Sequence, residues 1–249
     1  MDFRIIHIDE TDSTNRWLRA NGQDYTSSVA SDGADGHTVC EVVVAEYQTA
    51  GRGCGTNTWE SERGKNLTFS LMLHPEWLPA RRQFLISQAV SVALCETLET
   101  YIYNKVEIKW PNDIYVGDRK ICGILIENRL KGPHIADSIV GIGLNVNQAV
   151  FVSDAPNPVS LYQLTGKETD RDELLQRFLK HLEDAVYRPA ALMGYEERLY
   201  RREGWHAYKD AEGCFEAKMD GVMDDGRLML TDSGGNRRVY AFKEVTFVI

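Results

Sequence analysis

Residues 81–103 constrain the fold more than any other segment, because they are apolar on nearly every face of a helix. This pattern predicts a long helix packed against a sheet, rather than a helix with one face in water. Runs rich in β-branched and apolar residues lie on both sides of it and predict the strands of that sheet. The expected strands are residues 5–8, 42–47, 67–73, 106–110, 114–116, 120–128 and 139–146.

Capping residues indicate two further helices. The segment TDSTN, residues 11–15, offers several N-cap candidates directly before Trp17 and Leu18. Asp170 is expected to cap a second, amphipathic helix. The apolar face of that helix carries Leu174, Leu175, Phe178, Leu182 and Val186.

The pattern changes near Gly204. From Ala211 onward, short strand-like runs alternate with turns such as DG, DDG and DSGGN, which predicts a small antiparallel barrel. We therefore expect an α+β chain of two domains. Residues 1–203 are expected to hold a mixed central sheet flanked by helices, and residues 204–249 the small β-domain.

Composition and charge narrow the class of protein. The formal net charge of −9 argues against nucleic acid as the main partner, because such binding normally needs a basic face. The N-terminus has no apolar signal segment, and no run of residues is long and apolar enough to span a membrane. The five cysteines are dispersed without CxxC spacing, so neither a zinc site nor a disulfide framework is indicated, and a reducing cytoplasm fits best.

Residues 48–59, QTAGRGCGTNTW, form a segment that we call the glycine loop. Gly51, Gly53 and Gly55 can expose backbone N–H groups to an anion, and Arg52 can grip a phosphate or a carboxylate. The loop matches neither a P-loop nor a Rossmann fingerprint. The segment therefore fits two interpretations, a surface turn and an anion-binding loop.

Residues 109–128, KWPNDIYVGDRKICGILIEN, place charged groups between two apolar runs. Pro111 forces an extended conformation on Trp110, so a strand is expected to end there. Asn112 and Asp113 then lie at a strand end, where an amide and a carboxylate can hold magnesium beside phosphates. Lys120 is either a solvated hairpin lysine or a ligand-binding one.

Residues 141–147, GIGLNVN, have the same two interpretations. The two glycines and Asn145 fit two structures equally well: a bulged strand in the core, and a strand along which a ligand lies.

Taken together, these segments resemble the motif series of the biotin–protein ligases. The matching segments are TDSTN, AEYQTAGRG, KWPNDIY, DRKICGILIE, GIGLNVN and PVSL at residues 158–161. The resemblance implies a fold akin to class II aminoacyl-tRNA synthetases with a C-terminal SH3-like β-barrel. Because the motifs begin near residue 11, we expect the monofunctional type, without an N-terminal DNA-binding domain.

The resemblance also implies a two-step reaction. Biotin and ATP, with Mg, would form biotinyl-5′-AMP, and a lysine of a biotin carboxyl carrier domain, for example of acetyl-CoA carboxylase, would then accept the biotinyl group. No DNA and no membrane partner is expected, and the protein would be a cytoplasmic monomer or homodimer. A lipoate or octanoate ligase or transferase of the same fold is the alternative within enzymes. A binding module that has lost ligation is the alternative outside them, and the presence of Lys120 and Arg52 argues against it.

By motif position, the resemblance assigns residues to three groups. Lys120 and Arg52 would be catalytic. Biotin would be bound by Ser13, Thr14, Asn15, Gln48, Gly51, Arg52, Lys120, Gly123, Gly141 and Gly143. ATP and the adenylate would contact Cys54, Trp59, Lys109, Asn112, Asp113 and Asn145, with Asp113 as a magnesium ligand. A plain core aromatic is the alternative for Trp59.

The glycine loop departs from the family pattern. Many members have a second arginine at the position of Cys54, and glycine and often arginine where this chain has Thr56 and Asn57. Loss of these charges bears on how tightly the loop retains an adenylate. We expect the Cys54 thiol to be accessible without ligand, with Arg52 favouring its thiolate.

Overall fold

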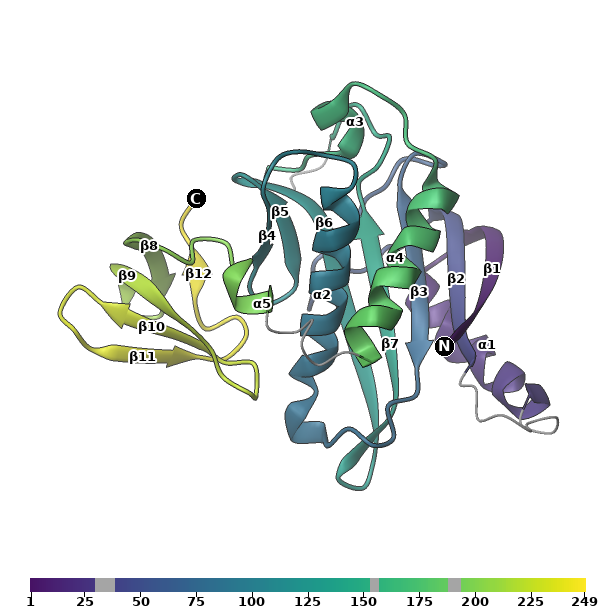
Figure 1. Cartoon of the computed structure of the whole chain (residues 1–249), viewed down its shortest axis with the longest axis horizontal. Coiled ribbons are helices and arrows are strands. Elements are labelled where there is room, and N and C mark those ends of the chain that lie inside the picture. Colours follow the sequence, from purple (N-terminus) through teal and green to yellow (C-terminus); the bar gives the residue numbers. More distant parts are fainter. Residues whose placement is uncertain (30–38, 153–156, 188–193) are drawn as a thin grey trace.

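The computed structural model describes residues 1–29, 39–152, 157–187 and 194–249. Its largest element is a seven-stranded sheet with the order β1-β2-β3-β7-β6-β5-β4 (Figure 1). β1 and β2 pair in parallel and all other neighbours are antiparallel, so the sheet is mixed, as expected. The strands are Asp2–Thr11 (β1), Val39–Gln48 (β2), Leu67–Leu73 (β3), Val106–Lys109 (β4), Asp113–Val116 (β5), Arg119–Lys131 (β6) and His134–Leu144 (β7).

Helices cover both faces of this sheet. α2 (Phe84–Glu99) and α4 (Arg171–Tyr187) lie side by side on one face (Figure 1). α1 (Thr14–Val29) packs on the other face, because Val43 joins its Leu18, whereas Val42 and Val44 point into the core beneath α2 and α4. This alternation explains why the consecutive residues 42–45 of β2 are all apolar and buried.

The predicted long helix is confirmed, with shorter bounds. Pro79 precedes a 3-10 helix, Ala80–Arg82, so the α-helix begins only at Phe84. The second predicted helix is also confirmed as α4. Asp170 caps it through its side chain, which accepts hydrogen bonds from the backbone of Asp172 and Glu173. Two short helices, α3 (Leu161–Thr165) and α5 (Gly194–Glu197), were not predicted.

The C-terminal strands form a second, five-stranded antiparallel sheet with the order β11-β10-β9-β8-β12. The first strand, β8, was missed by the sequence reasoning because it precedes the run of DG turns. The strands are His206–Asp210 (β8), Gly213–Val222 (β9), Leu228–Asp232 (β10), Arg237–Tyr240 (β11) and Thr246–Phe247 (β12). Within the described residues the edge strands β11 and β12 do not pair, so the expected barrel is an open sheet.

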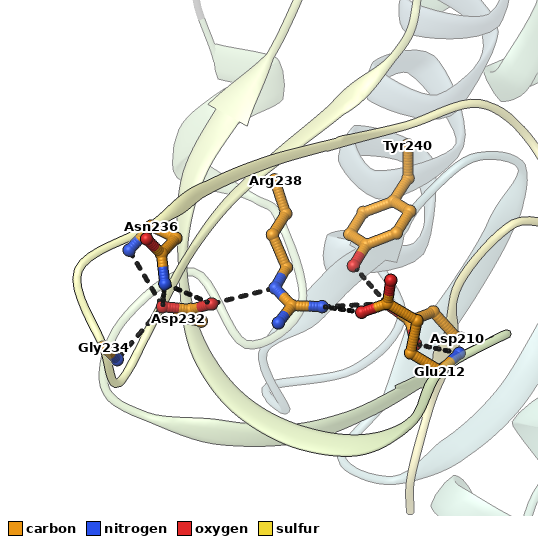
Figure 2. A network of polar contacts seen from close by, with 7 residues as sticks. All are labelled: Asp210, Glu212, Asp232, Gly234, Asn236, Arg238 and Tyr240. Carbon is orange, nitrogen blue, oxygen red and sulfur yellow. Dashed lines mark hydrogen bonds and ion pairs between the residues drawn. The ribbon is translucent and has the colours of Figure 1, made fainter.

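A polar network links distant strands of this open sheet (Figure 2). Arg238 of β11 crosses the ring of Phe215 on β9, with its guanidinium 4.4 Å from the ring centroid. The guanidinium then reaches Asp210 at the end of β8, at 3.1 Å, and donates from Nε to Asp232 of β10, at 2.9 Å. Tyr240 donates its hydroxyl to the same Asp210 carboxylate, at 2.6 Å. These side-chain contacts join the edge strand β11 to β8, two strands that are not neighbours in the sheet.

The second sheet is docked against the β4 end of the first. The Trp110 indole donates to the carbonyl of Gly226 at 2.8 Å, and the Tyr200 ring packs 6.1 Å from that of Phe247. Buried apolar side chains from both sheets belong to one continuous cluster on the α2 and α4 face of the first sheet. The β11–β12 connection thereby comes close to β4, β5 and the glycine loop.

Candidate functional site

A cavity of about 880 Å³ runs across the large sheet, from the start of α1 and the end of β2 to β4 and β5. It brings together segments that lie far apart in the sequence. Every residue predicted for the site lines it except Gly51: Ser13, Thr14, Asn15, Gln48, Arg52, Cys54, Trp59, Lys109, Asn112, Asp113, Lys120, Gly123, Gly141, Gly143 and Asn145.

At the α1 end, polar side chains form a buried hydrogen-bonded group. The Gln48 side-chain oxygen accepts from both the backbone N–H and the hydroxyl of Thr14, at 2.8 and 3.1 Å. Ser70 of β3, which the sequence reasoning missed, contacts Thr14 Oγ1 at 2.7 Å and Asn15 Oδ1 at 2.6 Å. These contacts fix the orientation of the hydroxyl and amide groups that border the cavity.

Asn15 and Arg52 share a second missed residue, Glu127. Asn15 donates to Glu127 Oε2 at 2.9 Å, and Arg52 Nη1 lies 3.2 Å from Glu127 Oε1. A Cβ added at Gly141 would lie 2.2 Å from Asn15 Oδ1, so this glycine leaves the room that Asn15 needs. The Asn15 amide is therefore hydrogen-bonded to protein groups, and Arg52 forms an ion pair with the Glu127 carboxylate of the sheet.

Trp59 packs its indole directly on the glycines of the sheet. A Cβ added at Gly143 would lie 2.2 Å from the indole, and one at Gly123 would lie 3.1 Å from it. Gly51 is needed for a different reason, since its Cβ would lie 2.3 Å from the Trp59 carbonyl oxygen. The Trp59 Nε1 is buried without a partner among the described residues. The indole lies over two glycines, Gly123 and Gly143, that the family resemblance assigns to biotin binding.

The charged residues of the 109–128 segment meet at the other end of the cavity. Lys120 Nζ lies 2.7 Å from Asp113 Oδ1, and the Trp59 ring centroid lies 5.7 Å from the same ammonium. Asn112 donates from Nδ2 to the carbonyl of Ile124 at 2.6 Å and to the Cys54 sulfur at 3.1 Å. Lys120 is thus a half-buried lysine within a cavity, and the solvated hairpin interpretation is wrong.

Lys109 is held by two aromatic rings. Its ammonium lies 5.0 Å from the Tyr115 ring centroid and 5.2 Å from that of Phe247 in β12. Burial lowers the pKa of Lys109, although the nearby Asp113 partly opposes this effect. A lysine desolvated in this way gains from an anion brought next to it.

Asn145 is buried and holds the backbone beside Lys120. Its side-chain nitrogen donates to the carbonyl of Val159 at 3.1 Å. Lys120 pairs with that same segment, because its backbone N–H donates to Asn157 and its carbonyl accepts from Val159. Asn145 therefore borders the cavity and also fixes the strand position of Lys120.

The expectation for the Cys54 thiolate is wrong. Burial raises the pKa of the Cys54 thiol, and the Asp113 carboxylate raises it further. The hydrogen bond from Asn112 and the nearby lysines only partly oppose these two effects. Arg52 does not activate the thiol, because it is paired with Glu127.

A third group of residues was missed because it comes from the C-terminal sheet. Phe242, Lys243, Val245, Thr246 and Phe247 complete the cavity wall. No motif marks them, and only the docking of the two sheets brings them to the glycine loop. Ser70 and Glu127 did carry a signal, since each is a polar residue within a largely apolar strand.

The donor set does not provide a resident metal site. Across the part of the chain that the structure describes, no group of three or more His, Cys, Asp or Glu side chains converges. Asp113 can contribute one carboxylate, and Mg²⁺ in nucleotide sites is often held by one or two carboxylates together with phosphates. The residues therefore fit magnesium that arrives with a nucleotide.

Sequence comparison identifies relatives of known name. The family profile described as Biotin/lipoate A/B protein ligase family matches residues 20–145. The Bifunctional ligase/repressor BirA of Bacillus subtilis is 31% identical over 215 residues, covering 80% of this chain and 64% of that protein. The Biotin--[acetyl-CoA-carboxylase] ligase of Paracoccus denitrificans is 30% identical over 246 residues, covering 90% of this chain and 97% of that protein.

Structural comparison agrees. The biotin protein ligase from Aquifex aeolicus, solved in complex with biotin and ATP, superimposes with a TM-score of 0.75 at 25% identity, covering 98% of this chain and 97% of that one. The chain belongs to the biotin/lipoate A/B protein ligase family. None of the described helices is long and apolar enough to cross a membrane.

Proposed function

We propose that this protein activates biotin with ATP and transfers it to a lysine of a biotin carboxyl carrier domain. One observation carries the proposal: a single cavity joins a fixed group of hydrogen-bonding side chains, around Thr14 and Gln48, to a group of cations around Lys109 and Lys120. A ligand with a polar ring at one end and a carboxylate at the other would span these two groups. The names of the relatives, which refer to biotin, support the same substrate.

In the first half-reaction, an oxygen of the biotin carboxylate attacks the α-phosphorus of ATP. The bond from that phosphorus to the bridging oxygen breaks, and pyrophosphate leaves with its electron pair. Two anions must approach one another, so cations at the point of contact lower the barrier. We assign this role to Lys120, with Arg52 moving from Glu127 to the ligand.

The other residues would bind and orient the substrates. Ser13, Thr14 and Gln48 would hydrogen-bond the ureido ring, and the glycine backbones of β6 and β7 would lie along the biotin chain. Lys109, Asn112 and Asp113 would contact the phosphates and the magnesium that accompanies them. We propose a positioning role for Asn15 and Asn145, because their amides are engaged by Glu127 and by the Val159 carbonyl.

In the second half-reaction, a lysine amine of the carrier attacks the acyl carbon of biotinyl-5′-AMP. The bond from that carbon to the phosphate oxygen breaks, AMP leaves, and the amine loses a proton to form the amide. Water must be kept from the anhydride meanwhile, which favours a closed glycine loop over the adenylate.

We further propose a cytoplasmic protein that acts as a monomer or homodimer without specific DNA binding. All five cysteines are free, which suits a reducing compartment. The formal net charge of −9 disfavours a polyanionic partner.

Incubation of the full chain with biotin, ATP and Mg²⁺ tests the proposal. Biotinyl-5′-AMP and pyrophosphate should form, and mass spectrometry would detect the adenylate. Lipoate and octanoate serve as parallel substrates, and equal or faster adenylation of either would replace biotin in the proposal. Transfer is followed on a carrier domain, with its acceptor lysine changed to arginine as the control.

A further inference from the structure

We propose that Lys243, from the turn between β11 and β12, binds the phosphates of ATP and supplies a second cation beside the single arginine of the glycine loop. The inference rests on the proposed function and adds a residue from the C-terminal sheet to the ATP site. Neither the motif series nor the sequence pattern singles out this lysine.

The contact between Lys243 and the glycine loop is close. A Cβ added at Gly55 would lie 2.0 Å from Lys243 Nζ and 3.2 Å from its Cε. The ammonium therefore packs directly on the backbone of Gly55, in a space that any side chain at this position would fill. Gly55 has a φ of +71°, a left-handed conformation that favours glycine, so its backbone lies open where the lysine enters.

The backbone of Lys243 is itself strained. Its φ is +72°, in the left-handed region that a side chain with a Cβ seldom adopts. Such strain persists where the surrounding structure requires it, and it clusters at ligand sites. Here the strained turn directs the lysine into the cavity wall beside Phe242 and Val245.

No carboxylate neutralises this ammonium. Across the described ranges, Lys243 has no ion pair and no hydrogen bond, and its nearest aromatic contact is the Phe242 ring, at 5.7 Å. Lys120 and Arg52 differ, because Lys120 is paired with Asp113 and Arg52 with Glu127, whereas Lys109 is held between two aromatic rings. Lys243 is thus available to an incoming anion without first breaking an ion pair.

The position of Lys243 identifies its ligand. Gly55 follows Cys54, whose sulfur contacts Asn112, and Asn112 precedes the Asp113 carboxylate that holds Lys120. This is the phosphate end of the cavity, remote from the Thr14–Gln48 hydrogen bonds. The loop carries cysteine, threonine and asparagine at positions 54, 56 and 57, so Arg52 is its only cation. Lys243 adds a second positive charge from outside the loop.

Biotin-dependent exchange of labelled pyrophosphate into ATP tests the assignment. Lys243→Gln and Lys243→Asn should each raise the KM for ATP by about tenfold or more, the effect of losing one charge-assisted hydrogen bond. The KM for biotin should stay near its wild-type value. Lys243→Arg should restore ATP binding. Asparagine tolerates the left-handed backbone, so the second variant separates charge from strain.

Lys218→Gln is the matched control, since Lys218 is an exposed lysine of β9 that does not line the cavity. An unchanged KM for ATP in both Lys243 variants would overturn the inference, as would an equal rise in the KM for biotin. If wild-type protein shows no biotin-dependent exchange, the proposed function itself fails. If the wild type shows exchange but the Lys243 variants keep its KM for ATP, only the inference about Lys243 fails.

Discussion

The ammonium of Lys120 and the carboxylate of Asp113 form an ion pair inside the cavity, with 2.7 Å between Nζ and Oδ1. Both side chains are more than two-thirds shielded from water, at 27% and 20% exposure. The carboxylate holds the lysine at the point where biotin and ATP would meet. Asp113 therefore has two tasks in the proposed reaction: it positions Lys120 before substrates bind and meets magnesium afterwards.

We predict that Lys120→Ala lowers the rate of adenylate formation by about two orders of magnitude, because removing one such charge from a transition state costs about 3 kcal/mol. Single-turnover formation of biotinyl-5′-AMP measures the effect. Lys120→Ala also leaves Asp113 unpaired, so the double variant with Asp113→Asn is the control for stability. Turnover near the wild-type rate would remove Lys120 from catalysis.

The second prediction concerns Gly143 and Trp59. Gly143→Ala introduces a methyl group 2.2 Å from the indole position, so Trp59 must move. We expect the free energy of unfolding to fall by about 1–3 kcal/mol. The loss should largely disappear in a Trp59→Ala background, where no indole is present to collide. Equal losses in both backgrounds would show that the backbone, not the indole, requires glycine.

The third prediction concerns acid stability of the C-terminal sheet. The Tyr240 hydroxyl and Arg238 hold the pKa of Asp210 below its usual range, and the Asn236 backbone N–H and Arg238 do the same for Asp232. A lowered folded-state pKa adds stability above the unfolded value of about 4, and this contribution is lost as the pH falls through the folded pKa.

The double variant Asp210→Asn, Asp232→Asn should therefore be less stable than wild type at pH 6. This difference in stability should become smaller below about pH 4. Thermal unfolding at several pH values measures it. Asp224→Asn, in the exposed turn between β9 and β10, is the matched control and should be as stable as wild type at every pH measured. A difference in stability between the double variant and wild type that does not change with pH would contradict the role of the two carboxylates.

The fourth prediction follows from the raised pKa of Cys54. Alkylation by iodoacetamide needs the thiolate, so Cys54 should react more slowly at pH 7.5 than the exposed Cys214, and faster as the pH rises. Peptide mapping by mass spectrometry resolves the two sites. Biotin with ATP should protect Cys54 and leave Cys214 unchanged. If Cys54 is labelled at the same rate with and without both ligands, the glycine loop does not close over Cys54.

Cys54→Arg is a fifth test. It returns to the glycine loop the positive charge common in the family, and it should slow the release of biotinyl-5′-AMP, because an arginine can pair with the phosphate. The rate constant for adenylate release, measured by chasing with unlabelled ligand, decides this. Unchanged or faster release would mean that adenylate retention does not depend on charge at this position.

Local patterns were sufficient for the strands of the large sheet and for α2 and α4, whereas the motif residues of the cavity were assigned through the family resemblance. The reason is that burial leaves a direct mark on the sequence: residues 42–45 of β2 are all apolar because helices cover both faces of the sheet. The Asp170 cap and the end of β4 before Pro111 were predictable for a similar reason, since each depends on backbone geometry a few residues away.

Contacts between distant segments were decided only by the tertiary structure. The pairing of Arg52 with Glu127, the packing of Trp59 on Gly143 and the burial that raises the Cys54 pKa each depend on which segments meet. The same is true of the open C-terminal sheet and of Lys243 beside Gly55. The sequence by itself determined which side chains were available for chemistry, because residue type and local spacing set charge and backbone conformation. Their partners and their solvation were set by the packing of the two sheets.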